Sequence, residues 1–210
     1  MKDFAPVARA GSYVFMLVVN KDLPVKTLPE LVAHAKANPG KLTYASGNTT
    51  GIVAGETLKN RAGIDVLQVP YKSTPPALND VIGGRVSMMF IDLAPGLQHV
   101  RAGTMRPLAV TTKERSALLP DLPSLSEAGI PGYDVTSYAA LFAPAGTPKD
   151  IVEKLNAEVQ KIIANPEAKS RIAVTGFDAF SGPPETLAAF VQTELVNWGR
   201  LIKDAGIEPQ

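Results

Sequence analysis

The sequence predicts an α/β fold in which a parallel or mixed β-sheet is flanked by helices. Short β-branched runs alternate with capped helical segments along most of the 210 residues, and this rhythm is typical of such folds. Hydrophobic residues make up 45 % of the chain, which is enough for a packed core. The length suits one large α/β domain or two small ones.

The first half of the chain shows the alternation most clearly. The apolar run 12–20 is predicted to be a buried strand,. Thr27 and Glu30 have the spacing of a capping box, so a helix is expected to start there and to end at Asn38-Pro39-Gly40,. Further strands are expected at 42–45, 66–69, 86–90 and 106–111, and helices at 52–62, from Thr74-Pro75 to Gly83-Gly84, and around 95–101,.

The second half begins with a change of composition. Residues 112–133 are rich in proline and glycine and are predicted to form a connector with one short helix capped by Ser124 and Glu127,. A strand is expected at 135–142, a helix from Thr147-Pro148, a shorter helix from Asn165-Pro166 and a strand at 177–180. The helix after Pro148 carries an apolar stripe of Ile151, Leu155, Val159 and Ile162,. A final helix is expected at about 184–205. The side chains expected to point toward the core are Leu187, Phe190, Val191, Leu195, Trp198, Leu201 and Ile202.

Composition argues against several classes of function. The formal net charge of +1 gives no basic footprint for nucleic acid,. The chain has no cysteine, so disulfides and cysteine–zinc sites are excluded,, and neither His34 nor His99 has the sequence context of a metal or triad histidine,. No metal, no cofactor and no catalytic residue is expected.

The N-terminal residues do not resemble an export signal. MKDFAPVARAGSY has one lysine and no continuous apolar core, so it is not a signal peptide,. No apolar stretch is long enough to cross a bilayer,. We therefore expect either a cytoplasmic protein or a sequence that begins after its export signal.

A polar bend at residues 46–50 is the most informative candidate site. It lies between a predicted strand and a predicted helix, where small residues admit a ligand and helical N–H groups are unpaired. That combination suits a carboxylate, although an ordinary capped turn is an equally good interpretation. The bend consists of Ser46, Gly47, Asn48, Thr49 and Thr50.

Two further candidates follow strands. Asp92 comes directly after an apolar strand, and ligands of open α/β sheets bind beyond the carboxyl ends of strands,. Capping of the turn toward Pro95-Gly96 is an equally good interpretation of Asp92. Tyr71 follows the strand at 66–69 and could line a cleft. The neighbouring Lys72 is expected to be exposed to solvent, as lysines usually are,.

At these residues the sequence resembles the Bug solute receptors of tripartite tricarboxylate transporters. The resemblance rests on KDFAPVARAGSYVFMLVVN, NPGKLTYASGNTTG, VPYKSTPPALNDVIGGRVSMMFIDL, VRAGTMRPLAVTT and FAPAGTPKDIVEKLNAEV, in this order along the chain. Ser73 and Gln98 stand where the family commonly has glycine and proline.

The resemblance implies a fold like that of type II periplasmic binding proteins, with one complete lobe and the C-terminal part of the other. Residues 11–111 would form the complete second lobe, 112–133 a connector, and 134–210 with 1–10 the remaining part of the first lobe. Most of the family's first lobe, including a loop that grips the ligand, would be missing. The orphaned C-terminal segment would then expose apolar surface and form a homo-oligomer, and ligand binding would be weak.

The resemblance also implies a function. The chain would be a periplasmic receptor that binds a small carboxylate and delivers it to a membrane permease. The bend at residues 46–50 would hold the ligand, with Tyr71, Asp92 and Tyr138 near the cleft. A sensory receptor for a signalling partner, a fragment that binds no ligand, and an α/β enzyme are the alternatives.

Overall fold

The structure, a computed structural model, describes residues 2–207. The chain forms two compact units. Unit 1 comprises Met1–Tyr13 and Ser137–Arg200, and unit 2 comprises Val14–Thr136 and the chain from Leu201 onward. No helix within residues 2–207 has the length and apolar character that a membrane span requires.

Unit 2 is built on a five-stranded mixed sheet with the order β4-β3-β5-β2-β6. Strand β3 runs parallel to β4 and to β5, whereas β2 runs antiparallel to β5 and to β6. The predicted parallel or mixed sheet is therefore confirmed as a mixed one. Its strands are β2 (Phe15–Asn20), β3 (Thr43–Ser46), β4 (Leu67–Pro70), β5 (Met88–Asp92) and β6 (Met105–Val110).

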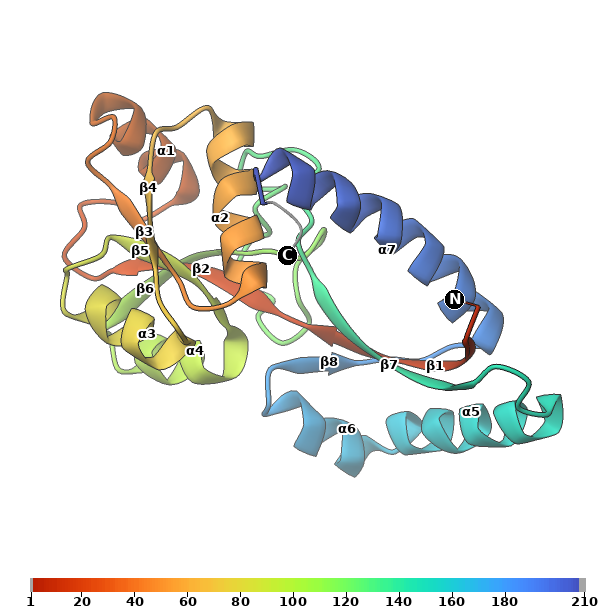
Figure 1. The fold of residues 1–210 in the computed structure, drawn as a ribbon. Coiled ribbons are helices and arrows are strands. Elements are labelled where there is room, and N and C mark those ends of the chain that lie inside the picture. Colours follow the sequence, from red (N-terminus) through yellow and green to blue (C-terminus); the bar gives the residue numbers. More distant parts are fainter. Residues whose placement is uncertain (1, 208–210) are drawn as a thin grey trace. The chain divides into compact units, whose positions relative to one another are not determined.

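Helices follow most strands of this sheet, and local signals explain where they start (Figure 1). The Thr27 hydroxyl accepts a hydrogen bond from the Glu30 N–H at 3.3 Å, as expected for a cap,. Helix α2 begins earlier than predicted because Asn48 caps it, so Thr49 and Thr50 lie in its first turn. The helices of unit 2 are α1 (Leu28–Ala37), α2 (Thr49–Ala62), α3 (Thr74–Ile82) and α4 (Leu93–Arg101).

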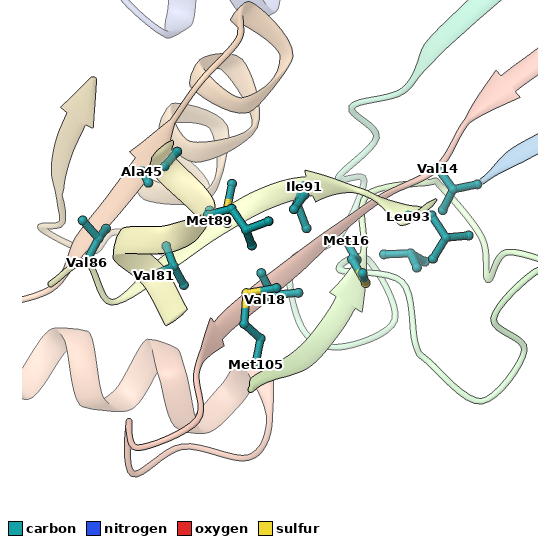
Figure 2. Close-up of a cluster of buried hydrophobic side chains, with 13 residues drawn as sticks. Val14, Met16, Val18, Ala45, Val81, Val86, Met89, Ile91, Leu93 and Met105 are labelled. Carbon is teal, nitrogen blue, oxygen red and sulfur yellow. The ribbon is translucent and has the colours of Figure 1, made fainter. Parts of the chain in front are cut away.

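The hydrophobic core of unit 2 gathers on the central strands. Met16 and Val18 of β2 pack with Met89 and Ile91 of β5, and all four side chains are buried (Figure 2). Val81 of α3 joins them from the helical layer. Burial of this apolar surface is the main term that stabilises the unit.

Residues 112–133 are an integral part of unit 2. Leu125 and Tyr133 are fully buried, and the Tyr133 hydroxyl donates to the Ala54 carbonyl of α2 at 2.7 Å. Ser124 and Glu127 form both hydrogen bonds of a capping box, each 3.1 Å long. The segment after them is a series of turns where a short helix was predicted, because Pro131 and the positive φ of Gly129 and Gly132 interrupt it,.

Unit 1 is built on a three-stranded sheet with the order β7-β1-β8. Strands β7 and β8 both run antiparallel to β1. The predicted single strand 12–20 is therefore two strands in two sheets, separated at Val14. The elements are β1 (Phe4–Tyr13), β7 (Ser137–Pro144), α5 (Lys149–Ala164), α6 (Pro166–Ala173), β8 (Phe177–Ala179) and α7 (Pro184–Asp204), whose last residues belong to unit 2.

The buried faces of α5 and α7 differ from those expected. Helix α5 buries Val152 and Asn156, while most of its predicted apolar stripe is exposed. The Asn156 amide donates to the carbonyls of Val7 and Gly182, both at 2.8 Å, so this inward polar side chain is satisfied,. On α7 the prediction for Leu195 is wrong, because this side chain is 61 % exposed.

Candidate functional site

Three neighbouring parallel strands end together at one edge of the sheet in unit 2. Strands β4, β3 and β5 end at Pro70, Ser46 and Asp92. Each is followed by a helix, α3, α2 and α4 respectively. Because a helix N-terminus carries unpaired N–H groups and a partial positive charge, this edge favours an anion.

The bend at residues 46–50 joins β3 to α2 at this edge. Asn48 is the N-cap of α2, and its side-chain oxygen accepts from the Gly51 N–H at 2.7 Å. The cap bond uses the oxygen, so the NH₂ group of the exposed Asn48 side chain remains available as a donor,. Thr49 is exposed and Thr50 is half-buried, which leaves their hydroxyls near the surface.

The backbone amides of this bend are open. Within residues 2–207, the N–H groups of Gly47, Asn48, Thr49 and Thr50 donate to no protein atom. The next two amides differ, since Gly51 donates to the cap and Ile52 to the Asn48 carbonyl at 3.2 Å. A short run of free donors therefore faces outward at the positive end of α2, and such a run can hold a carboxylate.

Gly47 is needed because another loop passes very close to it. A Cβ atom at Gly47 would lie 2.6 Å from the backbone of Ser73 and Thr74, at the start of α3. Helix α3 itself offers few donors, because Pro75 and Pro76 lack an N–H group,. The start of α3 therefore supports the bend, and the donors come from α2.

Ser46 anchors the bend to the sheet. The side chain is buried, and its hydroxyl accepts a hydrogen bond from the Gln68 amide at 2.8 Å. The Ser46 carbonyl accepts from the Tyr71 N–H, also at 2.8 Å. Ser46 thus holds β3 and β4 together beneath the open amides. Gln68 was missed by sequence reasoning, because a single glutamine on a strand gives no signal of this role.

Asp92 lies at the same edge, where β5 meets α4. Burial raises the pKa of its carboxyl group, and within residues 2–207 its side chain has no hydrogen bond to another residue. The carboxyl group accepts a hydrogen bond from its own backbone N–H, but a half-buried carboxyl group still costs free energy when ionised. It could accept a donor of a ligand, or donate its own proton to a ligand oxygen. Its role as a ligand contact stays a prediction.

Tyr71 is held by its own hydrogen bond. The hydroxyl donates to the Asp80 carboxylate at 2.7 Å, and this bond raises the pKa of Tyr71. Arg85 donates to the other oxygen of Asp80 at 2.6 Å. The ring packs against the hydrophobic core of unit 2, and the role of Tyr71 near a ligand stays a prediction.

Tyr138 belongs to unit 1. Its ring packs edge-on against Phe190 of α7, with the ring centroids 4.9 Å apart. Its place near a ligand also stays a prediction.

An α/β unit with open donors beyond its parallel strands has the arrangement in which open α/β sheets bind small ligands. The chain belongs to the tripartite tricarboxylate transporter family receptors. The model of this family matches residues 1–207. This is a family of receptors, so the alternative of an α/β enzyme is set aside.

Two relatives of known sequence are longer than this chain. The protein of the tcbD–tcbE intergenic region of Pseudomonas sp. strain P51 is 39 % identical over 204 residues, which are 96 % of this chain and 61 % of that protein. BugT of Bordetella pertussis is 29 % identical, and the match covers 98 % of this chain and 64 % of BugT. The chain thus spans less than two thirds of the length of these relatives.

Solved structures of relatives share the fold. Rpa4515 of R. palustris, determined with adipate, has a TM-score of 0.85 and 34 % identity, and the match covers all of this chain and 71 % of that one. The periplasmic binding protein BugD has a TM-score of 0.79 and 31 % identity, over 99 % of this chain and 71 % of BugD. MatC of Rhodopseudomonas palustris, with bound malate, has a TM-score of 0.74 and 29 % identity, over 95 % of this chain and 69 % of MatC. The fold is therefore that of these periplasmic binding proteins, in part.

Proposed function

We propose that the chain is a receptor that binds a small dicarboxylate and delivers it to a membrane permease. The observation that carries this proposal is the run of open amides from Gly47 to Thr50 at the start of α2. These amides, the amide group of Asn48 and the helix dipole would together hold one carboxylate of the ligand. The receptor makes and breaks no covalent bond.

Solved relatives support this class of ligand. Rpa4515 was determined with adipate and MatC with malate, and both ligands are dicarboxylates. BugD is described as a periplasmic binding protein, so the proposed place of action is the periplasm. The chain spans 61 % of the P51 relative and 64 % of BugT, so ligand contacts from the rest of a receptor of that length would be absent from a measurement on this chain. We therefore expect weak binding, with a dissociation constant of about 1 mM.

Calorimetry with matched ligands tests the proposal. The chain is titrated with adipate, with malate, and with adipamide, which keeps the shape of adipate but carries no charge. We expect measurable binding of the two acids and none of the diamide, because the bend recognises a carboxylate. Equal binding of adipate and adipamide, or no binding of either acid up to about ten times the expected dissociation constant, would contradict it.

We further propose that the chain forms a homo-oligomer through the segment after Thr147. The support is the exposed apolar surface of that segment, where Ile151, Leu155 and Ile162 of α5 remain accessible. Exposed apolar patches of this kind usually mark association.

A further inference from the structure

The loop between β4 and α3 supports the bend between β3 and α2, yet an ordinary helix cap cannot fix this loop. Its backbone at Ser73 and Thr74 lies so close to Gly47 that a Cβ atom there would be 2.6 Å away. Ser73 is the N-cap residue of α3, and among residues 2–207 its side chain makes no cap hydrogen bond. Such a bond would come from the N–H group of the second or third helical residue. These residues are Pro75 and Pro76, which have no N–H group,.

Tyr71 ties this loop to the other end of α3. Its N–H group donates to the Ser46 carbonyl at 2.8 Å, and its ring packs against the hydrophobic core of unit 2. Its hydroxyl donates to the Asp80 carboxylate at 2.7 Å. Because Asp80 lies in the last turn of α3, the side chain of Tyr71 connects the end of β4 with the far end of the helix. Tyr71 therefore holds the loop where a cap would otherwise do so.

Asp80 stands at a position where an acidic residue needs partners. A negative charge in the last turn lies at the negative end of the helix dipole, which is unfavourable. Two donors offset this cost, because the hydrogen bond from Tyr71 and the one from Arg85 lower the pKa of the Asp80 carboxyl group. The carboxylate is therefore ionised at neutral pH, and the bond that it accepts from Tyr71 is charge-assisted.

The two donors to Asp80 connect different parts of the chain. Arg85 follows α3 closely in sequence, and its side chain is 74 % exposed. An exposed ion pair of this kind contributes little to stability. Tyr71 belongs to the loop that lies against Gly47. Of the two bonds, the one from Tyr71 thus links Asp80 to the bend, and Arg85 offers a matched control on the same carboxylate.

We propose that Asp80 is a positioning residue for ligand binding, which acts through Tyr71 and the loop between β4 and α3. This inference rests on the proposed function, in which the bend holds a carboxylate. Asp80 fixes the Tyr71 hydroxyl, Tyr71 fixes the loop, and the backbone of the loop supports Gly47. Asp80 itself needs no contact with the ligand.

Amide NMR of the ligand-free chain tests this series of contacts. Tyr71→Phe keeps the ring in the core and removes only the hydroxyl, and Asp80→Ala removes its partner. We expect both variants to move the amide signals of Ser73 and Gly47 in the same direction, whereas Arg85→Gln leaves both signals in place. Unmoved Gly47 signals in folded Tyr71→Phe and Asp80→Ala would overturn the proposal. Because adipate plays no part here, that result would leave the proposed solute binding intact.

Adipate titrations of the same variants measure the effect on binding. We expect Tyr71→Phe and Asp80→Ala each to weaken binding about fivefold, and the double variant to agree with them within about twofold, because both changes remove one shared hydrogen bond. Arg85→Gln should keep the affinity of the unaltered chain. Full affinity in Asp80→Ala with a loss in Tyr71→Phe would place the hydroxyl on the ligand and refute the positioning role. If the unaltered chain binds no adipate, the proposed function fails, and the ligand-free spectra still decide whether Asp80 fixes the bend.

Discussion

Replacement of Gly55 by alanine is expected to destabilise unit 2 by about 3 kcal/mol, at the upper end of the usual cost of overpacking. A Cβ atom at Gly55 would lie 2.3 Å from the Tyr44 ring, which is fully buried beneath α2. The ring cannot move aside easily, because its hydroxyl donates to the Glu56 carboxylate at 2.6 Å. Helix α2 would have to shift, and the bend at its start would shift with it.

Urea unfolding followed by circular dichroism measures this change. Gly199→Ala is the matched control, because Gly199 also lies inside a helix but a Cβ atom there would meet no atom within 4 Å. The control should be neutral or stabilising by about 0.5–1 kcal/mol. Similar stability changes for the two variants would show that the close contact between Gly55 and Tyr44 does not exist.

Replacement of Gly47 by alanine is expected to weaken adipate binding at least about tenfold, which corresponds to about 1.4 kcal/mol. The added methyl group would meet the backbone of Ser73 and Thr74 at 2.6 Å. Backbone cannot rotate away as a side chain can, so the bend must move off the start of α3. The open amides would then no longer converge on one carboxylate.

Calorimetry with adipate measures the loss, and Gly199→Ala again serves as control because it introduces the same methyl group in open space. Thermal unfolding of both variants distinguishes lost binding from lost folding. Unchanged affinity in folded Gly47→Ala would mean that the bend is an ordinary capped turn.

Several parts of the fold could be predicted because their causes are local. The cap at Thr27 and the mixed sheet follow from hydrogen-bonding side chains and from short apolar runs,. The bend at residues 46–50 was also visible, because Asn48 is a strong capping residue between a strand and a helix,. The close approach of Ser73 and Thr74 to Gly47 brings two distant loops together, and no local pattern shows it.

Other parts depend on contacts between distant residues. The run 12–20 is uniformly apolar, so nothing in it marks Val14 as the point where the chain leaves one sheet for another. Residues 112–133 have the composition of a connector, but Tyr133 is buried by its contact with α2. On α5, helical spacing identified an apolar stripe and could not tell which side of the helix the sheet covers,.

The most direct test of the account is a titration of the unaltered, ¹⁵N-labelled chain with adipate, followed by amide NMR. We predict that the amide signals of Gly47, Asn48, Thr49 and Thr50 move most, because their N–H groups donate to no protein atom within residues 2–207 and are the proposed donors to the carboxylate. Adipamide should leave them in place. If adipate binds while these four signals stay fixed, the bend does not hold the carboxylate and the central claim is wrong.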